Sequence, residues 1–282
     1  MSRLTNSVVL VGAGNVATHL GLALRANGFS VEQVYSRTIA SAETLGKQLN
    51  ASYTDRLDEL YCEADWYILS VKDDVLPEII EKMPTVSGWI VHTSGSVSID
   101  VFAGSKWARY GVLYPLQTFS KNRKIDFSNI PVFIEASSPE AESELKKMAQ
   151  SFTNTVIHLN SEKRKYLHLS AVFACNFTNH LYALASEILD EQQLSWELLL
   201  PLIRETADKI EALSQEEAQT GPAARNDKAI MEKHLQLLEN SPDKQLLYRL
   251  LSESIYSRKT KNKPTFATLS EKEGEEECMK LP

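Results

Sequence analysis

The sequence has few cysteines, little glycine and proline, and no long apolar run, and each shortage excludes a class of protein. Its three cysteines, Cys62, Cys175 and Cys278, cannot all pair with one another and fit no disulfide framework. We therefore expect reduced thiols and a cytoplasmic location. Eleven glycines and ten prolines among 282 residues are too few for a collagen-like or low-complexity chain. No apolar run reaches the roughly 18 residues of a transmembrane helix, so we expect no membrane partner.

The chain also lacks an excess of basic residues. Thirty Lys and Arg residues against 37 Asp and Glu residues give a formal net charge of −7, so we expect no nucleic-acid partner. The six histidines form no HxxxH pair and the cysteines no CxxC pair, so we expect no zinc site. An apolar fraction of 43% is typical of a globular protein, and the length is sufficient for two domains.

Short apolar runs alternate with helical patterns through residues 1–160. Strands that are buried on both faces and alternate with helices indicate a parallel sheet covered by helices on each side. We therefore predict an α/β domain with a Rossmann-type doubly wound parallel sheet. The predicted strands cover residues 8–11, 31–35, 51–53, 66–71, 88–92, 111–114, 131–135 and 155–158.

The character of the chain changes after residue 160. Only helical patterns follow, and they predict an all-helical C-terminal domain over residues 161–257 that holds the substrate and the dimer contacts. The last residues, 258–282, are rich in Lys, Glu, Thr and Asn, which is typical of a charged flexible tail. The predicted helices of this half cover residues 162–189, 196–213, 228–239 and 244–256.

A glycine-rich motif, Gly12–Ala17, lies between the first predicted strand and the first predicted helix. It reads G-x-G-x-x-A, a form of the dinucleotide fingerprint: Gly12 permits the tight turn, Gly14 lets a diphosphate approach, and Ala17 allows close packing. The first N–H groups of the helix then face the phosphates. The alternative is a tight turn that binds nothing. The expected cofactor contacts in this motif are Gly12, Gly14, Asn15 and Val16.

The end of the second predicted strand indicates which cofactor binds. NAD-specific sites place Asp or Glu there to bind the ribose hydroxyls, whereas this chain has Ser36, Arg37 and Thr38. Arg37 offers a cationic fork to a 2′-phosphate, and the two hydroxyl groups offer further donors. We therefore expect NADP as the cofactor. The alternative is that Arg37 stacks on adenine or is an ordinary surface arginine.

Two further strand ends are polar, and parallel sheets bind ligands at the carboxyl ends of their strands. We expect Val71 and Lys72 near the nicotinamide ribose, and Ser94 near the nicotinamide or the substrate. His92 is either a hydrogen-bonded residue of the strand end or a catalytic group. The next strand-to-turn junction supplies two substrate candidates, Tyr114 and Gln117.

The long helical pattern from residue 162 carries a polar stripe on an otherwise apolar surface. At 100° per residue, Lys165, His168, Asn176 and Asn179 fall within roughly an 80° arc. Polar groups there need hydrogen-bond partners, which a substrate cleft, solvent or a helix interface can supply. His168 is the first choice for a catalytic acid because imidazole titrates near neutrality, with Asn176 orienting the substrate or the ring. Asn179 is a substrate candidate, and so is Arg225, which follows a Gly-Pro turn and suits an anionic group.

Five segments, GAGNVA, SRT, LYPLQTF, HLSAVFACNFTNHL and TGPAARNDKAI, occur in this order. Together they resemble a bacterial family in which a Rossmann domain precedes a helical domain of unknown function. More distantly, the chain is similar to pyrroline-5-carboxylate reductase, the deazaflavin-dependent NADP reductase and the 6-phosphogluconate dehydrogenase group. The resemblance implies a cofactor in the first domain, a small-molecule substrate in the cleft between the domains, and a homodimer formed through the helical domain.

The chain departs from these relatives at three places. Many relatives carry His at the position of Tyr114 and Gly at the position of Asn226, so the resemblance supports no acid–base role at position 114. The Lys-x-x-x-Asn pair of the hydroxyacid dehydrogenases is absent, because Leu169 follows four residues after Lys165.

These observations predict an NADP-dependent oxidoreductase that transfers a hydride between NADP(H) and a small C=O or C=N substrate. Two alternatives remain from the sequence. One is a non-catalytic NADP-binding sensor or assembly module, since a fold and a cofactor do not fix a function. The other is a reductase for a flavin or deazaflavin.

Overall fold

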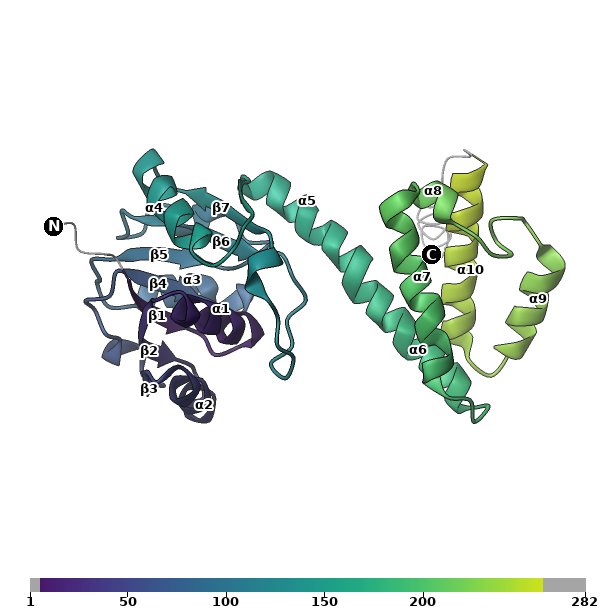
Figure 1. The fold of residues 1–282 in the computed structure, drawn as a ribbon, viewed down its shortest axis with the longest axis horizontal. Helices are drawn as coiled ribbons and strands as arrows, with labels where there is room; N and C mark the ends of the chain where they lie inside the picture. Colours follow the sequence, from purple (N-terminus) through teal and green to yellow (C-terminus); the bar gives the residue numbers. More distant parts are fainter. Residues whose placement is uncertain (1–5, 261–282) are drawn as a thin grey trace, which may run out of the picture. The chain divides into compact units, whose positions relative to one another are not determined.

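The computed structural model describes residues 6–260, and the chain divides into two compact units, the first up to Thr178 and the second from Asn179 (Figure 1). Among the described residues, no helix is both long enough and apolar enough to cross a membrane. Most of the predicted tail, from residue 261 onward, lies outside the described residues, and Arg258 and Lys259 belong to the last helix.

The described part of the first unit contains an eight-stranded sheet with the strand order β3-β2-β1-β4-β5-β6-β7-β8. All neighbouring strands are parallel except β6 and β7, so the predicted Rossmann-type class is confirmed. The chain order reverses between β1 and β4, which is where such sheets bind ligands. The strands are β1 (Ser7–Val11), β2 (Ser30–Tyr35), β3 (Ser52–Thr54), β4 (Trp66–Leu69), β5 (Trp89–His92), β6 (Tyr110–Pro115), β7 (Val132–Ala136) and β8 (Val156–His158).

Helices cover both faces of this sheet, and alternate residues of β1 therefore belong to two different apolar cores. Val8 and Leu10 pack in the core that contains residues of α1, α2 and α4, whereas Val9 and Val11 pack in the core that contains residues of α3. All four side chains are fully buried. The helices are α1 (Asn15–Ala26), α2 (Ile39–Leu49), α3 (Leu76–Lys82) and α4 (Pro139–Gln150).

The pairing of β6 with β7 departs from a purely parallel sheet. The connection between them contains only one helical turn, η4 (Phe127–Asn129), and so lacks the long crossover helix that usually joins parallel strands. β7 therefore runs back beside β6, with Val112 opposite Glu135 and Tyr114 opposite Phe133. α4 then crosses over and makes β8 parallel to β7.

The long helix predicted over residues 162–189 consists of three segments, α5 (Ser161–Ala171), a π-helical segment η5 (Val172–Phe177) and α6 (Thr178–Asp190). A π-helix bonds residue i to i+5, so the 100° step that placed Asn176 and Asn179 in one arc with His168 does not apply across it. The predicted domain boundary after residue 160 falls where α5 begins, whereas the first compact unit continues to Thr178, the first residue of α6.

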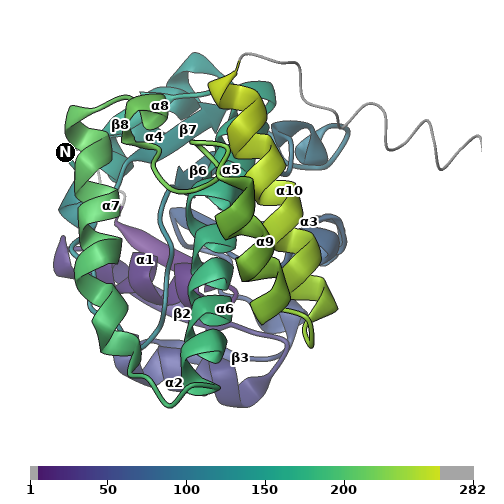
Figure 2. The same cartoon turned by 90° about the vertical axis from the view of Figure 1, so that its right-hand side faces the viewer.

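The second unit is entirely helical over its described residues, as predicted (Figure 2). α9 and α10 lie side by side, because the Tyr248 hydroxyl lies 2.8 Å from Nδ1 of His234 and Gln245 donates to the carbonyl oxygen of Leu235 at 2.6 Å. Asp227 caps α9 by accepting from the N–H of Ile230. Its elements after α6 are η6 (Trp196–Leu199), α7 (Leu200–Ala212), α8 (Gln215–Ala218), α9 (Lys228–Leu237) and α10 (Pro242–Lys259).

Candidate active site

The glycine-rich turn has the geometry that a dinucleotide requires. Gly12 has a φ of 121°, and a Cβ atom there would lie 2.2 Å from the carbonyl oxygen of Ser70, so a side chain is excluded. Gly14 precedes α1, and a Cβ atom on it would meet nothing within 4 Å. That space lies in front of the first N–H groups of α1, where anions bind. Ala17 is fully buried against the sheet.

A pocket of ≈ 390 Å³ opens at this turn, at the carboxyl ends of β1, β2 and β4. It brings together six of the predicted cofactor residues and contains two cationic side chains, Arg37 and Lys72. Both are exposed, whereas Ser36 and Val71 are half-buried. The lining residues are Gly12, Ala13, Gly14, Tyr35, Ser36, Arg37, Ser41, Ser70, Val71, Lys72, Val75, Glu78 and Ile79.

The sequence patterns did not identify several lining residues on α2 and α3. Glu78 bonds to Lys82 at 2.7 Å, and this bond, the lysine charge and the nearby Arg37 together lower the pKa of the Glu78 carboxyl. Ser41 is in the first turn of α2. No sequence motif marks these positions. They line the pocket because α2 and α3 begin close to the carboxyl ends of β2 and β4, and a local pattern does not reveal that packing.

Four predicted cofactor residues do not line this pocket: Asn15, Val16, Thr38 and Ser94. The Asn15 side chain donates to the carbonyl oxygen of Phe119 at 2.8 Å. Thr38 precedes α2 as its N-cap residue. The hydroxyl oxygen of Ser94 accepts from the N–H groups of Ser96 and Val97, so it stabilises the turn after β5.

The segment after β6 lies against the glycine-rich turn. The ammonium group of Lys121 donates to the carbonyl oxygen of Ala13 at 2.7 Å, and the carbonyl oxygen of Ser120 lies 2.9 Å from Nε2 of His19. The ring of Phe119 stacks on that of His19 at 5.3 Å. These contacts join distant parts of the sequence, and no local pattern predicts them.

His92 is fully buried at the end of β5. Its Nδ1 atom accepts from the N–H of Ser94 at 3.2 Å, and its ring stacks on Phe102. Burial, followed by the nearby charge of Arg164, lowers the pKa of His92 to about 3. The structure therefore favours a neutral, hydrogen-bonded residue of the strand end over a catalytic group in contact with substrate.

Tyr114 and His168 meet within the first unit. The Tyr114 hydroxyl on β6 lies 2.9 Å from Nδ1 of His168 on α5. Tyr114 is 8% exposed, and burial raises the pKa of its hydroxyl to about 12. A Cβ atom on Gly95 would lie 2.6 Å from Nδ1 of His168 and 2.8 Å from Cζ of Tyr114, so only glycine leaves room for this pair.

The other predicted substrate and catalytic residues are Gln117, Asn176, Asn179 and Arg225. Gln117 is exposed, and its side-chain oxygen accepts from the N–H of Thr118. Asn176 is exposed on η5. Asn179 and Arg225 are exposed residues of the second unit. Their functional roles stay predictions.

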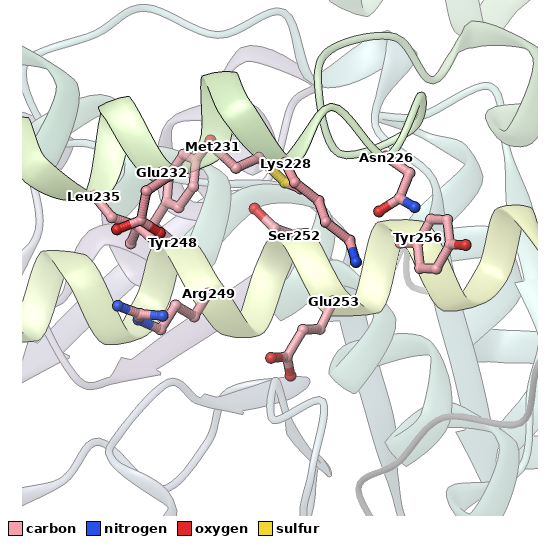
Figure 3. A pocket seen from close by; sticks show the side chains of 10 residues that line it. All are labelled: Asn226, Lys228, Met231, Glu232, Leu235, Tyr248, Arg249, Ser252, Glu253 and Tyr256. Carbon is pink, nitrogen blue, oxygen red and sulfur yellow. The ribbon is translucent and has the colours of Figure 1, made fainter.

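The second unit has a groove of ≈ 380 Å³ between α9 and α10 (Figure 3). None of the predicted site residues lines it. Its lining mixes apolar side chains with both signs of charge, and comprises Asn226, Lys228, Met231, Glu232, Leu235, Tyr248, Arg249, Ser252, Glu253 and Tyr256.

Two family models match the chain. A Rossmann-like domain matches residues 1–116, and a domain of unknown function, DUF2520, matches residues 130–255. Among curated proteins, the glucose-fructose oxidoreductase domain-containing protein 2 of Xenopus tropicalis is 31% identical over 102 residues. That match covers 35% of this chain and 27% of the relative, so the chain spans about a quarter of the length of that protein.

Solved structures match over nearly the whole chain. The Bacteroides fragilis structure described as a "putative NADP oxidoreductase" is 48% identical, with a TM-score of 0.85, covering 89% of this chain and 98% of that one. A pyrroline-5-carboxylate reductase from Coxiella burnetii is 16% identical, with a TM-score of 0.54, and covers 92% of this chain and 99% of its own. An imine reductase from Myxococcus stipitatus in complex with NADP⁺ is 18% identical, with a TM-score of 0.59, and the match covers 89% of this chain and 92% of that one.

The last two likenesses, both under 20% identical, show only that the chain shares the fold of those two proteins. The first shows a relative of nearly the same extent, and it confirms the family resemblance seen in the five sequence segments. The chain therefore belongs to the family in which a Rossmann-like domain is followed by the domain of unknown function DUF2520.

Proposed function

We propose that this protein is an NADP(H)-dependent oxidoreductase that transfers a hydride between the cofactor and a small C=O or C=N substrate. The observation that carries the proposal is the pocket at the carboxyl edge of the sheet, where the glycine-rich turn meets Arg37 and Lys72. The match to the Bacteroides fragilis structure supports this assignment. Because a fold alone does not fix a function, the residues that would act on a substrate also bear on this proposal.

The pocket residues fit an NADP molecule. The open space beside Gly14 and the start of α1 suit the diphosphate, since N–H groups and the helix dipole favour anions there. The guanidinium of Arg37 suits the 2′-phosphate, and the hydroxyl of Ser36 is a further donor. Lys72 and Val71, at the end of β4, are the residues we assign to the nicotinamide ribose.

When bound, the nicotinamide supplies or accepts the hydride. We assign the accompanying proton to His168. In the protonated ring, Nδ1 donates to the oxygen of Tyr114 and Nε2 carries the proton for the substrate oxygen or nitrogen. After that proton leaves, the neutral ring keeps its Nδ1 proton and its bond to Tyr114. The oxygen of Tyr114 accepts this bond throughout, and the raised pKa of its hydroxyl keeps the phenol neutral.

A change at Arg37 tests the cofactor assignment. Arg37→Asp should weaken NADPH binding about 10- to 100-fold, because it removes a charge-assisted hydrogen bond and adds a repelling carboxylate. NADH is the matched control, since it differs only in lacking the 2′-phosphate, and its affinity should change less than about threefold. Fluorescence titration measures both affinities. Equal weakening of the two nucleotides would refute the contact between Arg37 and the 2′-phosphate.

Turnover separates the enzyme from the non-catalytic alternative. The purified protein with NADPH should oxidise the cofactor in the presence of at least one small ketone, aldehyde or cyclic imine from a panel. His168→Gln should lower that rate about 100-fold or more, because a positioned general acid contributes roughly that factor. Tight NADPH binding without oxidation by any compound would instead favour a sensor or assembly module.

We also propose that two copies associate through the helical unit. The described part of this unit buries only two apolar residues, Ala223 and Leu235. Large apolar side chains such as Leu198, Leu202 and Leu237 are 65%, 63% and 82% exposed. Apolar surface on this scale marks an interaction site, and a twofold homodimer is the commonest way to cover it.

A further inference from the structure

One buried ion pair in the first unit takes no part in the proposed chemistry. Arg164 of α5 is fully buried, and its Nη1 atom donates to Oε2 of Glu135 on β7 at 2.6 Å. Its Nη2 atom donates to the carbonyl oxygen of Val97 at 2.6 Å and to the hydroxyl of Ser161 at 3.0 Å. One guanidinium thus connects α5, a strand and the segment after β5.

Ser161 completes this connection from the first turn of α5. Its hydroxyl donates to Oε2 of Glu135 at 2.6 Å and accepts from the N–H of Ile99 at 2.8 Å. Burying two charges costs about as much as their attraction returns, so such a pair is weak evidence of a gain in stability. A pair with this many directional partners is better suited to fixing one arrangement of helix and sheet.

The spacing of the pair matches the spacing of the site. Arg164 and His168 are four residues apart, on the same face of α5, which corresponds to a rise of about 6 Å. On the sheet, Glu135 is opposite Val112, and Tyr114 follows two residues later, which is about 6.8 Å along β6. Four helix residues therefore cover nearly the same distance as two strand residues, and His168 lies on Tyr114 when Arg164 lies on Glu135.

The fit tolerates little movement. The backbone of Gly95 is so close to His168 and Tyr114 that a single added carbon would overlap both. Leu167 packs beside them against the small apolar core formed by Val112, Tyr114 and Phe133. A rotation or slide of α5 would therefore separate the His168 ring from the Tyr114 hydroxyl or push it into the Gly95 backbone.

We propose that the Arg164–Glu135 pair sets the register of α5 on β6 and β7 and thereby positions His168 against Tyr114. Arg164 and Glu135 are then positioning residues, which act through His168 and touch no substrate. The geometric part of this proposal stands by itself, and its consequence for proton transfer rests on the proposed function.

The test replaces both charges at once, with Glu135→Gln and Arg164→Met in one chain. Removing both partners avoids the uncompensated buried charge that a single change would leave. The matched control is Glu144→Gln with Lys147→Met, which removes an exposed ion pair of 2.6 Å on α4. Nitrogen NMR of the histidine rings reports the hydrogen bond at Nδ1 of His168 and needs neither cofactor nor substrate. The His168 signals are identified as those missing from the spectrum of His168→Gln.

The double variant should fold, bind NADPH as the wild type does, and show the His168 Nδ1 signal shifted toward that of a ring without the Tyr114 bond. Its kcat should fall at least tenfold with little change in KM, whereas the control changes neither signal nor rate. A folded double variant with the wild-type His168 signal would overturn the proposal.

If the wild type itself shows no turnover, the proposed function fails, and the NMR signal still decides the positioning role. Should the double variant not fold, Arg164→Lys replaces it, because an ammonium group cannot form the same fork, and a wild-type signal there would equally overturn the proposal.

Discussion

The hydroxyl oxygen of Tyr114 lies 2.9 Å from Nδ1 of His168, although 54 residues separate them in the chain. This contact leaves Nε2 as the ring nitrogen available to a substrate. The contact also joins two residues that the sequence analysis treated separately, Tyr114 at a strand end and His168 on a long helix. The pair lies entirely within the first unit, which also holds the cofactor pocket.

The Tyr114 contact predicts a specific kinetic defect. Tyr114→Phe removes the oxygen that holds Nδ1, so kcat should fall about 10- to 100-fold while the affinity for NADPH stays unchanged, because Tyr114 does not line the cofactor pocket. Steady-state kinetics and a binding titration measure the two quantities. Tyr110→Phe, on the same strand, is the control and should leave kcat unchanged. Equal kcat values for Tyr114→Phe and the wild type would remove Tyr114 from the account.

The buried His92 predicts how stability depends on pH. Its pKa is about 3 in the folded protein because burial and Arg164 disfavour the charged ring, with Asp73 acting weakly in the opposite direction. The unfolded chain binds this proton below about pH 6.5 and the folded chain does not. His92 therefore lowers the free energy of unfolding as pH falls, by up to about 1.4 kcal/mol per unit between about pH 6.5 and 3.

Urea unfolding at pH 7 and at pH 5 measures this dependence. His92→Gln keeps a hydrogen-bond acceptor for Ser94 but cannot titrate, so its stability should fall less than that of the wild type between the two pH values. Identical losses in the two proteins would show that His92 does not supply the dependence.

The exposed leucines of the helical unit predict the oligomeric state. Light scattering after size-exclusion chromatography should give twice the 31.7 kDa mass of one chain. Leu198→Ser with Leu202→Ser should shift the protein toward the monomer, because these side chains are 65% and 63% exposed in the single chain. Leu22→Ser, on α1 of the first unit, is the control. A monomer at every concentration of the wild type would contradict the proposed homodimer.

Local sequence signals were sufficient for the sheet and for the glycine-rich turn. The apolar runs predicted eight strands, and the described residues form eight. The signal is clearest in strands such as β1 and β4, which are buried on both faces and leave a clear apolar run. At Gly12 a Cβ atom would overlap the carbonyl group of Ser70, as the tight turn of the motif requires, whereas the role of Gly14 beside a diphosphate stays a prediction. Asn226 has a φ of 54°, which lies in the left-handed region that favours glycine and tolerates asparagine.

Contacts between distant segments could not be predicted in this way. Nothing in the local pattern shows that Lys121 reaches Ala13 or that Arg164 bonds to Glu135, because those contacts depend on the packing of whole elements. The antiparallel β7 was missed because its apolar pattern is the same in either direction. The π-helical turn at residues 172–177 was missed because a sequence wheel assumes a constant step per residue.

Calorimetric titration with NADPH, on the wild type and on Gly14→Val, tests whether the glycine-rich turn binds the diphosphate of the cofactor. A Cβ atom at Gly14 meets nothing within 4 Å and its φ is −79°, so the variant should fold and melt as the wild type does. Its side chain would occupy the space assigned to the diphosphate. We expect binding heat for the wild type and an affinity at least about 100-fold weaker for Gly14→Val. No heat with the wild type, or the same affinity in both proteins, would contradict this expectation.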